Sequence, residues 1–329
     1  MKKKEWTVVT GAAGFIGRNV VAELNRRGVT NILAVDDPGT DERWKNLRGL
    51  EFADIWRIER FYDAFLNDNL PAVDNVYHLG ACSSTTETNA NFLLDNNYRF
   101  TQELCEFCLR NNARFVYASS AATYGDGGKS YSDDDQTTPT LVPLNMYGMS
   151  KQLFDMWALR NRLFDRIAGL KYFNVYGPGE EHKGDMRSVV NKAFGQILET
   201  GSVRLFKSYK PEYGDGDQLR DFIFVKDVVD VTLFCGDHPD ASGLFNCGTG
   251  QARSWNDLAK AVFAAMGREP RIDYIDMPPH LQGKYQYYTQ ADIGKLRTAG
   301  YHRAFTSLED GVREYVQEDL LIRAGGGGP

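Results

Sequence analysis

The stretch TGAAGFIG, residues 10–17, decides the fold of this chain. It follows a short apolar run and leads into a pattern of helical spacing. Gly11 permits a tight turn, Gly14 lets the backbone approach a pyrophosphate, and Gly17 lets the helix pack close to the sheet. A helix N-terminus at this point supplies free amides and a partial positive charge, which suit a phosphate. A strand, a glycine turn and a helix in this order favour a dinucleotide-binding unit over a turn that is glycine-rich for structural reasons alone.

Short apolar runs alternate with helical patterns through the first half of the chain. The runs are rich in β-branched or aromatic residues and too short for helices, as expected for buried parallel strands. They are TVVT (7–10), NILAVD (31–36), NVYHLGA (75–81), RFVYASS (114–120) and GLKYFNVYG (169–177). Helical spacing is found over 15–27, 58–67, 89–111 and 146–163. This alternation predicts an α/β fold with a doubly wound parallel sheet of the Rossmann type.

The character of the sequence changes after Gly177. Glycine, proline and charge become frequent, a helical pattern follows over 187–198, and a polar stretch, KSYKPEYGDGDQ, occupies 207–218. We expect a smaller α/β substrate-binding domain here, while DFIFVKDV (221–228) and LFNCGTG (244–250) indicate returns to the first domain. The predicted division is a dinucleotide-binding domain over 1–177 and about 221–250, a substrate-binding domain over about 178–220 and 251–324, and a flexible tail over 325–329.

The composition is that of an ordinary soluble globular protein. Of 329 residues, 42% are hydrophobic and 25% are charged, which excludes a disordered or collagen-like chain. The 38 Lys and Arg against 44 Asp and Glu give a net charge of −6, which argues against nucleic acid or an anionic membrane as the partner. No apolar run approaches the ~18 residues of a membrane span, and no export signal is recognisable. We therefore expect a cytoplasmic protein with a small-molecule partner.

Cysteine and histidine give no sign of a metal site. The five cysteines are odd in number and irregularly spaced, which fits a cytoplasmic protein. Cys105 and Cys108 form a Cys-x-x-Cys, but no second pair completes a zinc site, and the flanking ELCEFCLR is typical of a helix. His78 and the other histidines lack metal-ligand spacing, and we interpret them as structural.

Asp36 stands at the end of the second predicted strand, where a carboxylate commonly binds the adenosine ribose 2′-hydroxyl. Taken alone, this residue indicates NAD. Arg43 and Lys45 follow in the next loop and could instead meet the 2′-phosphate of NADP, or only cap a helix or face solvent. The residues themselves leave the choice between NAD and NADP open.

Tyr147 and Lys151 stand four residues apart on a predicted helix, so both side chains lie on one face. Ser120 ends a predicted strand, at the sheet edge where ligands bind in such folds. A tyrosine with a pKa of about 10 is a poor base at neutral pH, and lowering that pKa by ~3 units requires ~4 kcal/mol of differential stabilisation. Lys151 and the positive nicotinamide of an oxidised cofactor would favour the tyrosinate, which removes a hydroxyl proton as hydride leaves. Ser120 would position the hydroxyl oxygen.

Several motifs carry a resemblance to known families. TGAAGFIG (10–17), SSAATYG (119–125), YGMSK (147–151) and YFNVYGPG (172–179) together resemble the extended short-chain dehydrogenases/reductases that act on nucleotide-sugars. GACSSTTE (80–87), DNNY (95–98), EEHKGDMRSV (180–189) and GKYQYYTQAD (283–292) are similar to the family of ADP-L-glycero-D-manno-heptose 6-epimerases. The resemblance covers nearly the whole chain.

This resemblance implies an isomerase. It would convert ADP-D-glycero-β-D-manno-heptose to ADP-L-glycero-β-D-manno-heptose at C6″ by transient oxidation and re-reduction, in heptose supply for the lipopolysaccharide inner core. The resemblance also implies bound NADP, with NAD as the alternative, and a homo-oligomer of pentameric type.

The resemblance further implies roles for individual residues. The catalytic residues would be Tyr147 and Lys183 as the two acid/base groups, with Ser120 and Lys151. The cofactor-binding residues would be Gly11, Gly14, Phe15, Ile16, Gly17, Asp36, Asp37, Arg43, Leu79, Gly80, Ala81, Cys82, Ser83, Asn96, Tyr147, Lys151, Val175 and Lys183. The substrate-binding residues would be Ser120, Asn174, Asp185, Lys192, Phe206, Ser208, Arg220 and Tyr285. Two features depart from the family pattern, since Asp37 replaces the usual Asn and the 207–218 stretch is longer than expected.

A second acid/base residue has a physical use in this reaction. After the oxidation, hydride must return to the opposite face of the ketone while the nicotinamide stays in place. At an exocyclic carbon, rotation about one bond presents that face, and the new alkoxide then points away from Tyr147. Lys183 could act there, although an ordinary phosphate-binding or solvated lysine is the alternative.

Other functions share parts of this pattern. A nucleotide-sugar 4,6-dehydratase needs an Asp-Glu pair directly after the residue matching Ser120, where this chain has Ala121 and Ala122. A UDP-hexose 4-epimerase can use the Ser, Tyr and Lys alone, so only the need for Lys183 separates it, and this alternative stays open. A non-enzymatic dinucleotide-sensing regulator would be expected to have lost Tyr147 or Lys151, and both are present.

Overall fold

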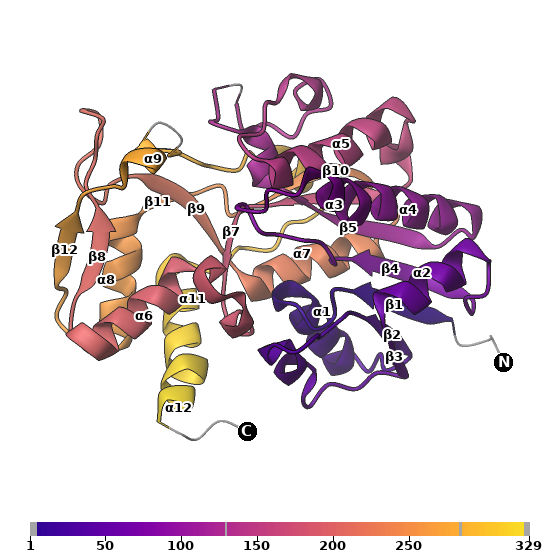
Figure 1. The fold of residues 1–329 in the computed structure, drawn as a ribbon, viewed down its shortest axis with the longest axis horizontal. Helices are drawn as coiled ribbons and strands as arrows, with labels where there is room; N and C mark the ends of the chain where they lie inside the picture. Colours follow the sequence, from indigo (N-terminus) through magenta and orange to yellow (C-terminus); the bar gives the residue numbers. More distant parts are fainter. Residues whose placement is uncertain (1–4, 129, 283–284, 326–329) are drawn as a thin grey trace.

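The structure, a computed structural model, describes residues 5–128, 130–282 and 285–325. The tail predicted over 325–329 lies outside the described residues except for Gly325, and so do the first two residues of the 283–292 motif. Figure 1 shows a large sheet between helices, with two smaller sheets beside it.

Seven strands form the large sheet, in the order β10-β6-β5-β4-β1-β2-β3. They are β1 (Trp6–Thr10), β2 (Ile32–Val35), β3 (Asp54–Trp56), β4 (Val73–His78), β5 (Arg114–Ser120), β6 (Ala168–Tyr172) and β10 (Gly243–Cys247). Every neighbouring pair is parallel. The predicted doubly wound α/β fold is confirmed, while the short strand β3 was not predicted.

Helices cover both faces of this sheet and form two hydrophobic cores with it. One core includes side chains of α1 (Phe15–Arg26) and α7 (Val225–Asp237), and the other includes side chains of α2 (Ile58–Leu66), α4 (Phe100–Arg110) and α5 (Met146–Arg160). The order of the strands reverses beside β1, which leaves a crevice at the carboxyl ends of the strands. The glycine turn after β1 and Ser120 at the end of β5 both lie at that edge.

The predicted helix over 89–111 consists of three consecutive segments. They are α3 (Ala90–Leu93), the π-helical segment η2 (Leu94–Arg99) and α4. π-Helical turns are rare and occur often at functional sites. Here the turn lies opposite the loop that follows β4, to which it is hydrogen-bonded.

The predicted strand over 169–177 is wrong in its extent. β6 ends at Tyr172, and β7 (Asn174–Tyr176) belongs to a different sheet. Phe173 lies between them, buried in a small aromatic cluster, and its amide donates to the Cys247 carbonyl at 3.1 Å. The apolar pattern continues through this bend because Phe173 has apolar partners of its own.

The smaller sheets occupy the left of Figure 1. β7 and β11 (Ala252–Ser254) flank β9 (Leu219–Phe224), and β8 (Val203–Phe206) pairs with β12 (Ile272–Ile275). The longer helices of this region are α6 (Val189–Thr200), α8 (Trp255–Ala265) and α11 (Leu308–Tyr315), and the short ones are α9 (Pro279–Gln282), α10 (Gly294–Thr298) and α12 (Leu321–Ala324). Residues 221–224 thus pair with β7 and β11, whereas 244–247 join the large sheet. The division into two domains stays a prediction.

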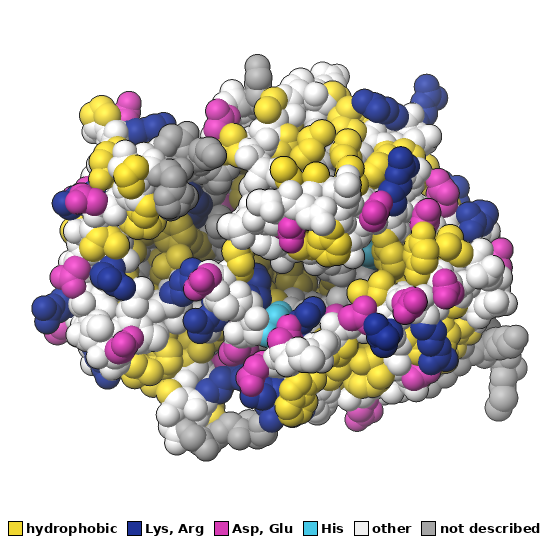
Figure 2. Space-filling model, viewed as in Figure 1, with side chains coloured by type: hydrophobic (Ala, Val, Ile, Leu, Met, Phe, Trp, Pro, Cys, Tyr) yellow, Lys and Arg dark blue, Asp and Glu magenta, His cyan; other side chains and the backbone are white. Residues whose placement is uncertain are grey.

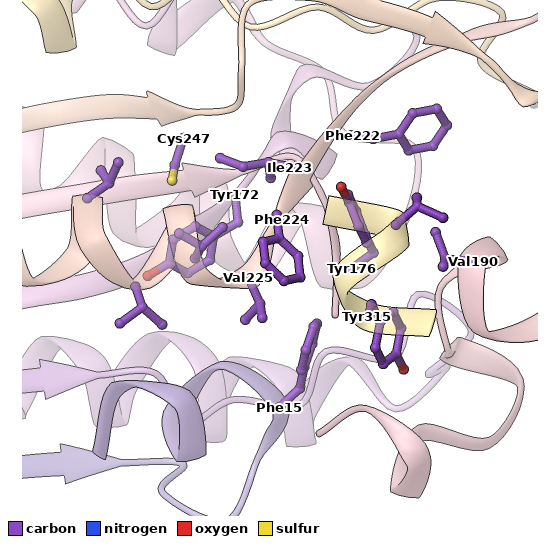
Figure 3. Packing of buried hydrophobic residues seen from close by; sticks show 14 of the residues in the cluster. Phe15, Tyr172, Tyr176, Val190, Phe222, Ile223, Phe224, Val225, Cys247 and Tyr315 are labelled. Atoms are coloured by element: carbon purple, nitrogen blue, oxygen red, sulfur yellow. The ribbon is translucent and has the colours of Figure 1, made fainter. Parts of the chain in front are cut away.

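A continuous core joins the large sheet to the three-stranded one. Figure 3 shows Phe15, in the first turn of α1, pointing toward Phe224 and Val225. Tyr176 of β7 and Phe224 of β9 pack with their ring centroids 5.5 Å apart in the same core. The helix that follows the glycine turn therefore rests on side chains from both parts of the molecule.

The surface mixes charges of both signs. On the face shown in Figure 2, Lys and Arg are interspersed with Asp and Glu. Within residues 5–128, 130–282 and 285–325, no helix is both long enough and apolar enough to cross a membrane. The same ranges contain no group of three or more His, Cys, Asp or Glu arranged to hold a metal ion.

Candidate active site

The glycine turn after β1 forms a tight cradle. Gly11 has a φ of +69°, and a Cβ there would lie 2.7 Å from the Gly80 amide nitrogen. A Cβ at Gly17 would lie 2.0 Å from the Gly11 carbonyl oxygen, so neither position tolerates a side chain without a backbone shift. Gly14 precedes α1, and no side chain caps that helix. The amides of its first turn, at Phe15, Ile16 and Gly17, therefore suit a pyrophosphate.

Asp36 ties this cradle to the end of β2. One carboxylate oxygen accepts from the Ala13 amide at 2.8 Å, and the other accepts from the Asp37 amide at 2.8 Å. Burial raises the pKa of Asp36, and the hydrogen bond from Ala13 and the charge of Arg43 oppose that rise. Arg43 lies 3.9 Å from the Asp36 carboxylate and 2.9 Å from Asp41. A carboxylate suited to a ribose hydroxyl and a guanidinium suited to a 2′-phosphate thus lie side by side.

The loop after β4, Leu79 to Ser83, lies against the cradle. The Gly80 amide donates to Thr10 Oγ1 at 3.0 Å, and the same hydroxyl lies 2.7 Å from His78 Nδ1. Burial lowers the pKa of His78 to about 3, so the imidazole is neutral. His78 therefore supports the loop as a hydrogen-bonding group, in keeping with a structural role.

Asn97, which the sequence analysis did not single out, holds this loop in place from η2. Its side chain accepts from the Cys82 amide and donates to the Cys82 carbonyl, both at 2.9 Å. It also donates to Ser150 Oγ at 3.0 Å, which links the loop to α5. Asn96, the predicted residue, is half-buried and donates to Asn97 Oδ1 at 2.9 Å. The sequence marks Asn97 only through the pair of asparagines in DNNY. Ordinary helical spacing could not identify it, because that spacing does not hold in a π-helical turn.

Ser120, Tyr147 and Lys151 come together at the carboxyl end of β5. The Asn145 side chain caps α5 by accepting from the Gly148 amide at 2.8 Å, which starts the helix at the residue before Tyr147. The Ser120 side chain hydrogen-bonds the Tyr147 phenol. Lys151, one turn further along α5, has 4% of its surface exposed. The structure thus gathers the three residues that the spacing suggested.

Burial acts on the two ionisable groups of this site in opposite directions. It raises the pKa of the Tyr147 phenol, which the hydrogen bond from Ser120 opposes. It lowers the pKa of Lys151 to about 8, which the charge of Asp155 opposes. The surroundings therefore shift both pKa values toward the neutral forms, although Lys151 keeps its proton at neutral pH, and a further positive charge would shift Tyr147 in the direction that a general base requires.

Lys183 approaches the cradle from another part of the chain. It lies in η6 (Glu181–Met186), a 3₁₀ segment with a kink at Gly184, and its ammonium nitrogen is 5.3 Å from the centroid of the Phe15 ring. Burial lowers the pKa of Lys183, and the charge of Glu180 opposes this shift. Glu180 is itself buried and accepts from Ser188 Oγ at 2.6 Å. The Lys183 segment is therefore fixed at the start of α6 and faces the first turn of α1.

Three predicted substrate residues form one cationic and aromatic cluster. Arg220 is buried, with its guanidinium carbon 5.1 Å from the Tyr285 ring centroid and 5.6 Å from that of Trp255. Phe206 meets Tyr285 edge to face at 6.2 Å, and Trp255 Nε1 donates to the Tyr285 hydroxyl at 2.9 Å. Sequence analysis missed Trp255, since no motif marks it. A guanidinium between aromatic walls suits a diphosphate or a stacked nucleobase.

The other predicted site residues lie around these groups. Asn174 and Asp185 are exposed, and Lys192 and Val175 are half-buried. Ser208 is bonded within its own loop, where its amide donates to Asp215 at 2.7 Å and its hydroxyl donates to the Lys210 carbonyl at 2.9 Å. In the described part of the chain, no hydrogen bond or ion pair joins Asn174, Asp185, Lys192 or Ser208 to the Arg220 cluster.

The two departures from the family pattern have separate places. Asp37 forms an ion pair with Arg57 at 3.1 Å on the surface. The 207–218 stretch packs on Tyr287, with the Tyr213 ring centroid 5.3 Å and Lys210 Nζ 4.8 Å from the centroid of that ring. Because Tyr287 in turn packs on Tyr285 at 5.6 Å, the longer loop extends the aromatic cluster around Arg220.

A doubly wound parallel sheet, a glycine cradle after β1 and a Ser, Tyr and Lys group between β5 and α5 define a dinucleotide-binding enzyme of the short-chain dehydrogenase/reductase class. The model of the "NAD dependent epimerase/dehydratase family" matches residues 7–248. The chain is 56% identical over 314 residues to the ADP-L-glycero-D-manno-heptose-6-epimerase of Nitratidesulfovibrio vulgaris, covering 95% of this chain and 97% of that one. It is 46% identical over 323 residues to the enzyme of that name from Fusobacterium nucleatum, with coverage of 95% and 97%. The chain therefore belongs to the NAD dependent epimerase/dehydratase family and, within it, to the ADP-L-glycero-D-manno-heptose-6-epimerases.

Solved structures agree with this assignment. The ADP-L-glycero-D-manno-heptose-6-epimerase of Helicobacter pylori superposes with a TM-score of 0.78 at 25% identity, covering 95% of this chain and 96% of that one. A UDP-N-acetylglucosamine 4-epimerase of Methanobrevibacter ruminantium superposes with a TM-score of 0.79 at 25% identity, with coverage of 98% and 99%. The resemblance inferred from the motifs is confirmed, and the shared fold extends to epimerases of other nucleotide-sugars.

Proposed function

We propose that this protein is an isomerase that converts ADP-D-glycero-β-D-manno-heptose to ADP-L-glycero-β-D-manno-heptose at C6″, by transient oxidation and re-reduction with bound NADP. The observation that carries the proposal is that Tyr147 and Lys183, the two candidate acid/base groups, both lie at the sheet edge that carries the glycine turn. Tyr147 lies with Ser120 at the end of β5, and Lys183 lies against Phe15 at the start of α1. The high identity to relatives named for this epimerisation supports the same substrate.

The residues of the cradle fit a nicotinamide dinucleotide. The first-turn amides of α1 would bind the pyrophosphate, and Asp36 and Arg43 would meet the adenosine ribose. When bound, the cofactor supplies a hydride acceptor that later gives the hydride back. NADP is proposed over NAD because Arg43 offers a cation beside the ribose position, where a 2′-phosphate would add a charge-assisted contact.

The oxidation step uses the groups at the end of β5. Ser120 orients the C6″ hydroxyl, and Tyr147 Oη takes the hydroxyl proton while the hydrogen on C6″ departs as hydride. Lys151 favours the tyrosinate through its positive charge, which matters because burial alone raises the pKa of Tyr147. The product of this step is a ketone, and the proton stays on Tyr147.

The return step needs a different proton source. Rotation about the bond between the ring and the exocyclic carbon presents the other face of the ketone, and the oxygen then points away from Tyr147. The Lys183 ammonium donates a proton to this oxygen as hydride returns to C6″, and the resulting neutral amine is the form that burial favours. One turnover leaves a proton on Tyr147 and removes one from Lys183, so the two groups re-equilibrate with solvent before the next cycle.

The setting of this reaction follows from the same proposal. An ADP-heptose epimerase belongs to heptose supply for the lipopolysaccharide inner core, and we propose that this protein works there in the cytoplasm as a homo-oligomer. The resemblance of the motifs supports this setting. Measurement of the molar mass in solution tests the oligomer separately from the chemistry.

Proton NMR of two candidate substrates tests the proposed function directly. The protein is incubated separately with ADP-D-glycero-D-manno-heptose and with UDP-galactose. We expect inversion at C6″ of the heptose and no change in UDP-galactose, because inversion of a ring carbon requires the whole pyranose to turn over while the diphosphate is held. Inversion of UDP-galactose at C4 would instead identify a UDP-hexose 4-epimerase, the alternative that solved relatives of the same fold represent.

A further inference from the structure

An ion pair that the proposed reaction does not use lies directly behind the candidate active site. Lys171 on β6 and Asp155 on α5 pair at 2.8 Å, and neither side chain has any exposed surface. Removing two charges from water is costly, so a buried pair requires that its remaining hydrogen-bonding groups also find partners. In this protein, those partners are Tyr117, Ser119 and Thr123, on β5 and in the turn that follows it.

Asp155 links the end of β5 to α5 through hydrogen bonds. Its Oδ1 accepts from the Tyr117 hydroxyl at 2.8 Å, and its Oδ2 accepts from Ser119 Oγ at 2.8 Å as well as from Lys171. Ser119 directly precedes Ser120 on the strand, and Asp155 stands one turn after Lys151 on the helix. The carboxylate therefore joins the strand that carries Ser120 to the helix that carries Tyr147 and Lys151.

Lys171, on the neighbouring strand β6, supports the same end of β5 through hydrogen bonds. Its ammonium donates to Thr123 Oγ1 at 2.7 Å, and the Thr123 hydroxyl donates to the Ser120 carbonyl at 2.8 Å. The ammonium also lies 5.1 Å from the centroid of the Tyr124 ring. Ser119 and Lys171 are direct partners in the β5 and β6 register. Ser120 is thus held through the residue before it by Asp155 and through its own carbonyl by Lys171.

We propose that the Lys171 and Asp155 pair is a positioning element of this active site, which holds Ser120 against α5 and sets the net charge that Lys151 and Tyr147 face. The inference rests on the proposed function, because it concerns the group that would perform the oxidation. Lys171 and Asp155 are positioning residues, since they act through Ser120 and Lys151.

The charge balance around Lys151 makes the inference testable. Titratable and charged side chains face Lys151, Tyr147 and the ion pair from several elements. These elements are β4 and its following loop, β5 and the turn after it, α5 and β6. The side chains are His78, Cys82, Tyr117, Tyr124, Asp155 and Lys171. His78 is neutral, and burial raises the pKa of both tyrosines, so these three carry no charge near neutral pH. Asp155 raises the pKa of both Lys151 and Tyr147. Lys171, at 2.8 Å from the carboxylate, offsets that negative charge.

Removing the positive charge of the pair and removing its negative charge should therefore shift the pKa of Lys151 in opposite directions. We measure dinucleotide affinity by calorimetry as a function of pH, because the Lys151 ammonium would help to hold the cofactor ribose and loses its proton near a pKa of about 8. Lys171→Met leaves the charge of Asp155 uncompensated, so the midpoint of this pH dependence should move up by about one pH unit. Asp155→Asn leaves the cation uncompensated and should move it down by about one unit. The double variant should return the midpoint close to that of the unaltered protein.

Two further variants separate positioning from simple loss of stability. Arg114→Met removes a buried cation from the opposite end of β5, where Arg114 donates to the carbonyls of Cys235 and Ala241 at 2.9 and 2.8 Å. We expect it to lower the melting temperature without moving the midpoint. Ser119→Ala removes one neutral donor from Asp155 and creates no unpaired charge. It should move the midpoint in the same direction as Lys171→Met, by a smaller amount.

The outcomes are distinct. Midpoints that coincide in all variants, or that shift in the same direction for Lys171→Met and Asp155→Asn, would overturn the proposal, because a purely structural pair gives no shift that depends on the sign of the charge. If the single-charge variants do not fold, an unchanged midpoint in Ser119→Ala overturns it. Failure of the proposed function is seen separately, as the absence of any heptose inversion by the unaltered protein in the NMR experiment.

Discussion

Tyr147 carries the oxidation step of the proposed reaction, and the Ser120 hydrogen bond is its direct contact at the end of β5. Tyr147→Phe removes the hydroxyl and keeps the ring, so we expect dinucleotide affinity within a few fold of the original. Turnover should fall by ~10²-fold or more, the effect of a lost general acid/base. Steady-state conversion of ADP-heptose and calorimetric dinucleotide binding measure the two quantities. Near-normal turnover would show that another group takes the proton.

The pKa of Lys151 predicts how dinucleotide binding depends on pH. Burial lowers this pKa to about 8, so the ammonium is present below pH 8 and is lost above it. A cation held against the cofactor ribose strengthens binding, so affinity should be constant at lower pH and weaken as the pH rises through about 8. Calorimetric titrations across that range measure it. Lys151→Met should bind weakly with no such dependence, and the same midpoint in that variant would assign the titration to another group.

Lys183 should act only in the return step. In Lys183→Met, oxidation by Tyr147 is retained, so the substrate should still reduce the bound cofactor, which is visible as reduced-nicotinamide absorbance. Release of inverted heptose should fall by ~10²-fold or more, because the alkoxide on the new face lacks its proton donor. The matched control is Lys226→Met, an exposed lysine on α7 that pairs with Glu314 on the surface. Full-rate epimerisation by Lys183→Met would contradict the two-base mechanism.

Single residues differ in how well the sequence predicts them. Ser120, Tyr147 and Lys151 were predicted because each has a fixed place relative to a strand end or a helix turn, and the structure gathers them. Asn97 and Lys171 were not predicted. Their importance comes from hydrogen bonds to Cys82 and Thr123, residues 15 and 48 positions away in the chain. Partners at such separations leave no periodic signal in a single sequence.

At the scale of elements, α1 requires a residue without a side chain at its contact with the glycine turn. A Cβ at Gly17 would lie 2.0 Å from the Gly11 carbonyl oxygen, and both atoms belong to the backbone. Gly17→Ala should therefore displace α1 and abolish dinucleotide binding in calorimetry. The matched control is Gly195→Ala in α6, where a Cβ meets nothing within 4 Å. It should keep full binding and gain about 0.5–1 kcal/mol of stability, and loss of binding there would point to general unfolding.

The elements themselves could be predicted well where apolar runs are short and bounded. The strands β1, β2 and β5 follow the predicted runs closely, whereas β4 ends at His78, so the last three residues of the predicted run 75–81 belong to the loop that follows it. Between its first and last residues, the run 169–177 contains no glycine or proline, so nothing in its pattern separates β6 from β7. The bend at Phe173 is decided by the aromatic cluster that receives its ring, which is a tertiary contact. Local pattern therefore predicts that a buried segment exists but not which sheet it joins.

At the scale of the whole molecule, the candidate site is assembled from segments far apart in the chain. The cradle comes from residues near the N-terminus, Tyr147 from α5, Lys183 from η6, and the Arg220 cluster from β8, β9 and the segment around Tyr285. The core in Figure 3 joins α1, β7 and β9, so the cradle and the substrate-side segments share one packed interior. The sequence pattern alone predicted the first half of this assembly. The substrate half was predicted only by resemblance, because its residues share no local spacing.

The stability of the whole molecule should report which dinucleotide it binds. A ligand that binds only the folded protein stabilises it by about 2.7 kcal/mol at one hundred times its dissociation constant. We expect NADP to raise the melting temperature more than NAD at equal concentration, because Arg43 lies 3.9 Å from Asp36 at the ribose end of the cradle. Arg43→Ala should lower the affinity for NADP about tenfold, or by ~1.4 kcal/mol of that stabilisation, and leave the effect of NAD nearly unchanged.

Lys45→Ala in the same short helix, where Lys45 pairs with Glu42, is the control and should change the effect of neither dinucleotide. Scanning calorimetry with each dinucleotide measures these shifts. Equal losses for NADP and NAD in Arg43→Ala would show that this guanidinium does not face a 2′-phosphate.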